Sequence, residues 1–121
     1  MKYAVLYENG RVLERVRVAD TYFTRLRGLM GKRNIREGLL LYPCSQVHTY
    51  FMREPIDVVY LDRGGQVLSV VTAMEPGRLG WYIHGAVRVL ELPAHHWSQL
   101  NCGNIIQIED YKEPEYVKAI G

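Results

Sequence analysis

The stretch from Gly38 to Asp62 constrains this chain more than any other, because it joins two strand-forming runs to several groups able to do chemistry. The run 38–42 is apolar without a break and ends at Pro43, which is typical of a short strand buried on both faces. The run 56–61 is rich in β-branched residues, and the glycines that follow it predict a tight turn. The stretch therefore predicts strands around which the rest of the chain is arranged.

An extended segment is also predicted between these two runs. Side chains over 46–53 would alternate between two sides, with His48 and Met52 on one side and Arg53 on the other. Pro55 ends this segment, because proline donates no hydrogen bond and restricts the residue before it.

The remaining elements predict a mainly β domain, α+β by strict count: a compact antiparallel sandwich or barrel with two short helices. The first helix would begin at Asp20 or Thr21, end at Gly31, and lay an apolar stripe on the sheet. That stripe consists of Tyr22, Phe23, Leu26, Leu29 and Met30. The other predicted elements are strands at 3–7, 12–18, 66–74, 86–92 and 105–109, and a second helix at 94–100.

The overall composition is that of one ordinary globular domain. We expect it to cover residues 1–110, followed by a flexible C-terminal tail at 111–121 that is polar and contains proline. A net charge of +2 demands neither nucleic acid nor a membrane as partner. Two cysteines are too few for a disulfide framework, and we expect a cytoplasmic, reduced protein without a signal peptide. The oligomeric state stays open.

Two carboxylates lie within apolar strands, and such groups are costly to bury unless they are paired or hydrogen-bonded. Asp57 and Glu91 are these residues, and Arg53 could pair with Asp57 at the corner that Pro55 forms. This structural interpretation has a functional alternative, a polar pocket that receives a small anionic or polar ligand or a peptide end. The residues predicted to line it are His48, Arg53, Asp57 and Glu91, with Cys44 and Met52.

Cys44 and His48 allow two further interpretations, a metal pair or a catalytic dyad. Four residues along a strand span about 13 Å, too far for a shared ion with bonds of about 2.0–2.3 Å. We therefore predict no metal site and no cofactor, and we expect His48 to be a hydrogen-bonded structural residue. A hydrolase or transferase that uses Cys44, or a pair of His48 and Asp57, remains the enzymatic alternative, although no nucleophile elbow or phosphate loop is present.

A cluster of cations follows the first helix and gives a third interpretation, an anion-binding patch. Its members are Arg25, Arg27, Lys32, Arg33 and Arg36, with no acid before Glu37. The dipole of the helix explains some of them, since cations are favoured at a helix C-terminus. Aromatic residues do not alternate with these charges, so nucleic acid is the less expected ligand.

Several motifs, in order, resemble one family of bacterial and archaeal proteins, DUF192 (also UPF0127). They are Arg27–Gly31, Gly38–Leu41, Pro43–Cys44, Val47–Thr49, Phe51–Arg53, Pro55–Val58, Leu61–Asp62, Val89–Ala94 and Gly103. The resemblance runs from about Thr21 to Ile108 and implies a compact β-rich domain of bacterial or archaeal origin, with no established activity. This chain departs from the family pattern at Glu54, His95 and Asn104. The leading interpretation is a small non-catalytic binding domain.

Overall fold

The computed structural model describes residues 2–97 and 100–111, which form one mixed β-sheet with a single short helix. The strands are β1 (Tyr3–Glu8), β2 (Arg11–Ala19), β3 (Leu39–Leu41), β4 (Ile56–Leu61), β5 (Val67–Met74), β6 (Arg88–Pro93) and β7 (Gln107–Tyr111), and the helix is α1 (Tyr22–Arg27). β7 begins and ends two residues later than the predicted last strand at 105–109, and the rest of the predicted tail, 112–121, lies outside the described residues. The mainly β prediction is confirmed.

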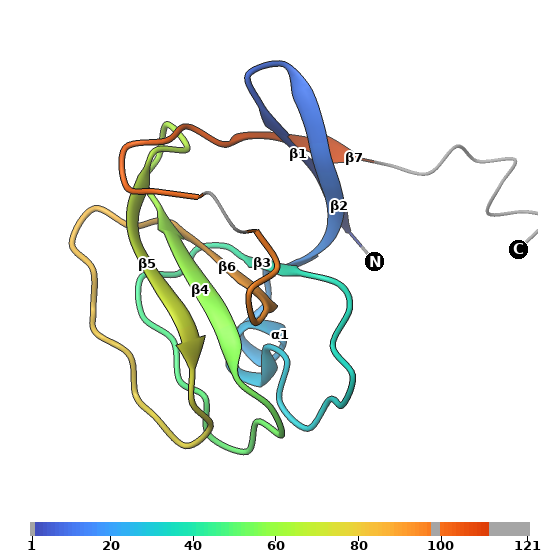
Figure 1. Ribbon diagram of the computed structural model, residues 1–121, viewed down its shortest axis with the longest axis vertical. Coiled ribbons are helices and arrows are strands. Elements are labelled where there is room, and N and C mark those ends of the chain that lie inside the picture. Colours follow the sequence, from blue (N-terminus) through green and yellow to red (C-terminus); the bar gives the residue numbers. More distant parts are fainter. Residues whose placement is uncertain (1, 98–99, 112–121) are drawn as a thin grey trace, which may run out of the picture.

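The seven strands have the order β5-β4-β6-β3-β2-β1-β7. All pairs are antiparallel except β2 with β3, which run parallel because the helix and a long loop connect them. β5 and β7 are the two end strands, so the sheet is not closed and the barrel prediction is wrong, whereas a sandwich arrangement stays a prediction (Figure 1).

Apolar residues cover both faces at the centre of the sheet. All residues of β3 and β4 are buried, as the unbroken apolar run at 38–42 predicted for β3. One face packs around Val58, Tyr60 and Val89, and the other around Val59, Leu61 and Leu90. Each central strand therefore contributes alternate side chains to two separate cores.

Strand register places the two buried carboxylates on opposite faces. Val58 pairs with Glu91, and its neighbour Asp57 pairs with Leu92. Because side chains alternate along a strand, Glu91 shares the face of Val58, and Asp57 shares the face of Leu92. Glu91 also pairs with Leu39 of β3, so apolar side chains flank it on both neighbouring strands.

The helix is shorter than predicted, and its apolar stripe is not part of the core. Thr21 caps the start of the helix with a capping box. The helix ends at Gly28, which has a positive φ of 50°, and not at Gly31 as predicted. No residue of α1 is buried, whereas Leu29, just after the helix, is only 4% exposed. The stripe prediction is wrong because the turn at Gly28 directs only Leu29 to the sheet.

The segment 46–53 is not a strand, which corrects a second prediction. Its one ladder contact is a bridge between His48 and Leu79. Thr49 donates to Glu75 O at 2.6 Å and accepts from Arg78 N at 2.8 Å, so this segment is tied to the connection between β5 and β6 and not to a strand. Phe51 has a φ of 61°, which interrupts any extended run.

The predicted second helix is absent from the described part of 94–100. Residues 94–96 form a turn and a bend, and His95 has a φ of 61° that no α-helix contains. Ser98 and Gln99 lie outside the described residues. Within the part of the chain that the structure describes, α1 has six residues, which is far too short to cross a bilayer.

Candidate ligand-binding cavities

The predicted site residues divide between the two faces of the sheet instead of meeting in one recess. Cys44, His48 and Glu91 line one cavity, whereas Asp57 lines another on the opposite face. Arg53 is exposed and lines neither cavity. Met52 is buried in the core on the face of Glu91. The prediction that His48, Arg53, Asp57 and Glu91 meet in one pocket is therefore wrong. Of the predicted residues, Cys44, His48 and Glu91 share a cavity.

Asp57 binds backbone groups and has no ion pair in the described part of the chain. Its carboxylate accepts hydrogen bonds from Ala73 N at 2.8 Å and from His95 N at 2.9 Å. Both donors belong to residues with positive φ, 50° at Ala73 and 61° at His95, which is an unusual conformation for residues with a side chain. Asp57 is thus hydrogen-bonded to the backbone, but it holds these two bends and does not pair with Arg53 at the Pro55 corner.

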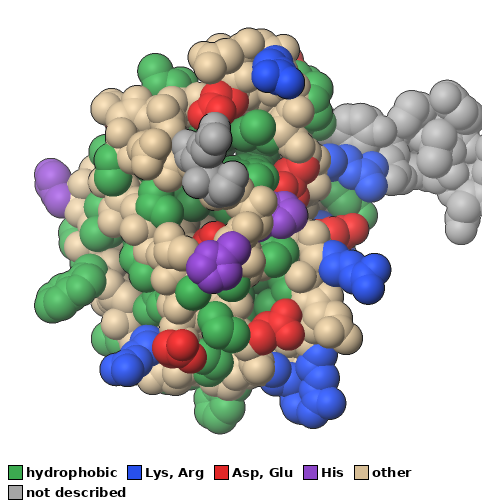
Figure 2. Space-filling view, in the orientation of Figure 1, with side chains coloured by type: hydrophobic (Ala, Val, Ile, Leu, Met, Phe, Trp, Pro, Cys, Tyr) green, Lys and Arg blue, Asp and Glu red, His purple; other side chains and the backbone are tan. Residues whose placement is uncertain are grey.

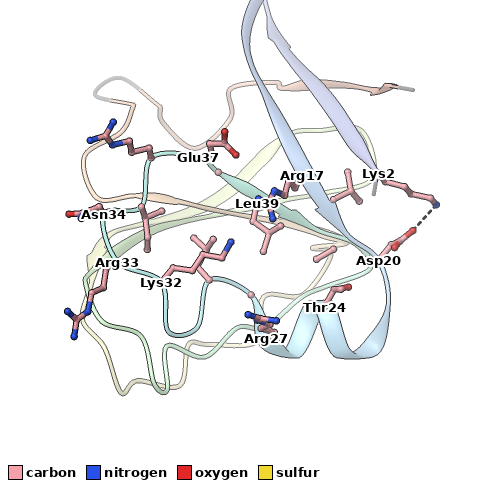
Figure 3. Close-up of a pocket in the computed structure, with 17 residues that line it drawn as sticks. Lys2, Arg17, Asp20, Thr24, Arg27, Lys32, Arg33, Asn34, Glu37 and Leu39 are labelled. Carbon is pink, nitrogen blue, oxygen red and sulfur yellow. Dashed lines mark ion pairs between the residues drawn. The ribbon is translucent and has the colours of Figure 1, made fainter. Parts of the chain in front are cut away.

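A larger cavity of about 660 Å³ lies between α1, β2 and the loop that precedes β3. We call it the basic cavity, since six cations line it against two acids. The cations are Lys2, Arg17, Arg27, Lys32, Arg33 and Arg36, and the acids are Asp20 and Glu37. Figure 3 shows Lys32 reaching across the cavity toward Leu39, with Arg27 at the rim and Arg33 pointing outward.

Most of this positive charge has no ion pair among the described residues. Lys2 and Asp20 form an ion pair at 2.7 Å, drawn as a dashed line in Figure 3. The other five cations have no ion pair with any residue that the structure describes. Apolar side chains, among them Leu29, Ile35 and Leu39, lie beneath them. The cavity thus combines an apolar floor with a positively charged rim.

Glu54 holds the loop that carries three of these cations. Its carboxylate accepts hydrogen bonds from Asn34 N at 3.1 Å and from Ile35 N at 2.7 Å. Asn34 has a φ of 53°, so these bonds stabilise a bend in the loop. Glu54, where this sequence departs from the family pattern, therefore orders the loop 32–36.

A second cavity, of about 350 Å³, has the Glu91 carboxyl group at its floor, and we call it the carboxyl cavity. Glu91 is 2% exposed and accepts one hydrogen bond in the described structure, from Leu29 N to Oε1 at 3.2 Å. A Cβ atom at position 28 would lie 2.5 Å from Oε1, so only glycine allows the helix end to approach the carboxyl so closely. Arg27 and Gly28 line both cavities, which therefore adjoin at the end of α1.

Burial dominates the electrostatics of the carboxyl cavity. Loss of hydration raises the pKa of Glu91 from 4.5 to about 7, although the hydrogen bond from Leu29 opposes this shift. Burial is also the largest cause that raises the pKa of Tyr60 to about 12. Negative charge on the Cys44 thiolate and on the Glu91 carboxylate acts in the same direction. Burial at this place in the fold therefore disfavours the charged forms of Glu91 and Tyr60.

The states of Cys44 and His48 argue against a thiolate–imidazole dyad. Burial raises the pKa of the Cys44 thiol, which donates to Gln46 O at 3.3 Å. His48 Nε2 donates to Leu26 O at 3.0 Å, and its Nδ1 accepts from Tyr50 N at 3.2 Å. Both ring nitrogens are therefore occupied, as expected of a structural histidine. Among the described residues, no three potential ligands are close enough to hold a metal ion.

Sequence reasoning missed several residues of these cavities. Lys2 and Arg17 line the basic cavity although they precede the predicted patch in the sequence. Arg25, a predicted member of the patch, lines the carboxyl cavity instead. The alternation of side chains along β2 places Arg17 on the polar side of this strand, so the sequence did indicate that Arg17 is not part of the core. No local pattern indicated that Gly28 would contact the Glu91 carboxyl, because this contact joins residues 63 positions apart.

Comparison with known proteins gives the family. The model of DUF192, described as "Uncharacterized ACR", matches residues 4–108. The chain belongs to the DUF192 family. The family has no established function, so membership in DUF192 confirms the resemblance and leaves the activity open.

Curated relatives of this DUF192 chain carry the name UPF0127 protein. One from Thermococcus sibiricus is 34% identical over 93 residues, which are 72% of this chain and 60% of the relative. Another from Thermococcus kodakarensis is 32% identical over 64% of this chain and 59% of the relative. The chain thus spans about 60% of the length of these relatives. They are archaeal, so they do not support the prediction of a bacterial source.

Two solved structures share the fold of this DUF192 domain. A protein of unknown function from Novosphingobium aromaticivorans has a TM-score of 0.67 and 15% identity, and covers 87% of this chain and 83% of its own. A putative transcription regulator from Sinorhizobium meliloti has a TM-score of 0.67 and 18% identity, and covers 90% of this chain and 92% of its own. At these identities the likeness concerns the fold alone.

Proposed function

We propose that this domain is a non-catalytic binding module whose basic cavity takes a small ligand with several negative charges. The observation that carries the proposal is the set of five cations without an ion pair in the described structure, around a cavity of about 660 Å³. Clustered like charges repel one another, and a multivalent anion relieves that repulsion. This proposal combines the predicted binding domain with the predicted anion patch, without Arg25 and with Lys2 and Arg17 at the rim.

The lining of the cavity favours a small anion over nucleic acid. None of its side chains is aromatic, so bases would have no ring on which to stack. Its apolar floor, which includes Leu29 and Ile35, would accept the hydrocarbon part of a ligand. These features fit a phosphorylated, sulphated or polycarboxylate metabolite with an apolar portion.

The chemistry of the neighbouring groups supports binding over catalysis. A nucleophilic cysteine needs a lowered thiol pKa, and burial raises the pKa of Cys44. Asp57 cannot orient His48, because it binds backbone amides on the other face of the sheet. A cytoplasmic location and the absence of a membrane partner stay predictions.

Calorimetric titration with inorganic triphosphate tests the proposal. Binding should weaken as salt rises, because several cations each exchange a counterion for the ligand. Phosphate should bind at least about tenfold more weakly, since it offers fewer charges. Binding that does not change with salt, or no binding of triphosphate at low salt, would contradict the proposal.

Substitutions locate the site. Lys32→Gln and Arg27→Gln each remove one charge from the cavity and should weaken triphosphate binding about three- to tenfold. Arg63→Gln is the matched control, because Arg63 is exposed in the turn between β4 and β5 and does not line the cavity. Equal losses in all three variants would indicate a general charge effect and not a site.

A further inference from the structure

Large apolar side chains are exposed around the mouth of the carboxyl cavity. Trp81 is 84% exposed, and Phe23 and Phe51 are each 79% exposed. We call this set the aromatic rim; it consists of Tyr22, Phe23, Leu26, Tyr50, Phe51, Leu79, Trp81 and Tyr82. Tyr22, Leu26 and Tyr82 line the cavity itself. A gathering of exposed apolar residues on one surface marks a site of interaction.

Hydrogen bonds hold the three segments of the rim together. Leu26 O accepts from His48 Nε2, and the His48 ring stacks on Tyr50 with 5.1 Å between the ring centres. Gly31 N donates to Phe51 O at 3.1 Å, which joins the loop after α1 to the segment 46–53. The connection from β5 to β6 is also bound to the segment 46–53, because Gln46 Nε2 donates to Gly80 O at 2.9 Å. Figure 1 shows α1 and these connections at the same end of the molecule, away from the β1–β2 hairpin.

The floor of the cavity presents a carboxyl group without a cationic partner. Glu91 has no ion pair with any residue that the structure describes, and Leu29 N is its one donor. A buried carboxylate is strongly stabilised by a cation that donates hydrogen bonds to it. The ammonium group of a ligand would be such a cation. Arg25, on the cavity wall, has guanidinium donors that suit a carbonyl oxygen.

We propose that the carboxyl cavity and the aromatic rim bind the free amino terminus of an apolar peptide segment. The ammonium group donates to Glu91, the first peptide carbonyl accepts from Arg25, and the apolar side chains lie on the rim. The volume of about 350 Å³ suits one terminal residue, so the following residues lie outside on the exposed rings. This site adjoins the basic cavity at Arg27 and Gly28 but takes a ligand of opposite charge.

Amino-acid amides provide the smallest probe of an amino terminus. We expect leucinamide and phenylalaninamide, at millimolar concentrations, to cause saturable NMR shifts of the backbone amides of residues 44–48 and 82. Their N-acetyl forms keep the side chain but lack the ammonium group, and should bind at least about tenfold more weakly. Equal binding of the free and acetylated forms, or no saturable shift with any probe, would overturn the proposal.

Glu91→Gln tests the role of the carboxyl group, because glutamine keeps an acceptor oxygen for Leu29 N but replaces the other oxygen with an uncharged NH₂ group. This variant should lose the preference for the free amine and bind both forms alike, while its affinity for inorganic triphosphate stays unchanged. Glu109→Gln, an exposed change in β7, is the control and should keep the preference. A Glu91→Gln variant that still prefers the free amine would overturn the assignment to Glu91. Thermal unfolding of each variant verifies that it is folded.

Trp81→Ser tests the rim with a longer probe. The tripeptide amide Leu-Phe-Leu should bind Trp81→Ser several-fold more weakly than the wild type, whereas leucinamide should bind both equally, since Trp81 does not line the cavity. Because Trp81 is almost fully exposed, this variant should fold normally. Vesicles with anionic lipid distinguish a membrane surface: binding to them that depends on Trp81 but not on Glu91, without binding of the amides, would overturn the proposal in favour of lipid.

Discussion

The backbone of Gly28 lies against the buried carboxyl group of Glu91. A Cβ atom at position 28 would stand 2.5 Å from Oε1, and the next residue, Leu29, donates its N–H to the same oxygen. This relationship fixes the end of α1 over the central strand β6. It also separates the basic cavity from the carboxyl cavity, because Gly28 lines both.

Gly28→Ala should destabilise the domain more than Gly31→Ala. Both glycines have positive φ, 50° and 77°, so alanine strains the backbone by about 1–3 kcal/mol at either position, and more at Gly28, whose ψ of −129° lies outside the left-handed helical region. Only at position 28 does the added methyl group also meet Glu91, since position 31 has open space around it. Urea unfolding would measure the difference. Removing the carboxyl group with Glu91→Ala should recover part of the loss in Gly28→Ala; purely additive effects would contradict the contact.

Stability should fall as pH rises from about 4.5 to about 7. The pKa of Glu91 is 4.5 when unfolded and about 7 when folded, so in this range the folded protein binds more protons than the unfolded chain. The free energy of unfolding therefore decreases with pH there, by about 3 kcal/mol in all, and levels off above pH 7. Glu91→Gln should remove this part of the pH dependence. A wild type and a variant with parallel stability curves would contradict the assignment.

Asp57→Asn should cost about 1–3 kcal/mol of stability. The amide keeps one acceptor but turns an NH₂ group toward the N–H of Ala73 or His95, which leaves a donor facing a donor. Urea unfolding measures the loss, and Asp110→Asn at an exposed position is a control that should change little. A stable Asp57→Asn variant would indicate that the two bends hold without the carboxylate.

Glu54→Ala should loosen the loop 32–36 more than the whole domain. The amides of Asn34 and Ile35 lose their acceptor, so their hydrogen exchange should accelerate about fivefold or more, while amides of β4 and β6 keep their rates. Exchange monitored by NMR reports each amide separately. Acceleration spread evenly over the sheet would show that Glu54 supports the fold as a whole.

Leu29→Ala should destabilise the domain far more than Phe23→Ser. Phe23 is 79% exposed, so its replacement should change the free energy of unfolding by no more than about 0.5 kcal/mol. Leu29 is buried in the core beside Val58 and Val89, and its truncation should cost about 2–5 kcal/mol. Chemical denaturation of both variants would detect this contrast. A large loss in Phe23→Ser would mean that the helix stripe packs after all.

The loops and the helix show where sequence periodicity fails. The apolar spacing of Tyr22, Phe23 and Leu26 fits a helix that packs on a sheet, but the same spacing arises when a helix presents aromatic rings to solvent. Likewise, alternation over 46–53 resembles a strand, but its backbone bonds go to the connection at 75–80. A local sequence pattern predicts the conformation of one segment. It does not predict which other segment packs against it.

The sequence by itself determined the mainly β class, the burial of β3, the presence of β4, the cap at Thr21 and the membership in DUF192, because these depend on continuous runs and ordered motifs. Only the tertiary structure decided which polar groups share a cavity. Asp57 and Glu91 are both carboxylates in apolar strands. In the pairing of β4 with β6, Glu91 lies opposite Val58, the residue after Asp57, so the two carboxylates point to opposite faces of the sheet. That register depends on pairings across more than 30 residues of chain, which no local spacing encodes.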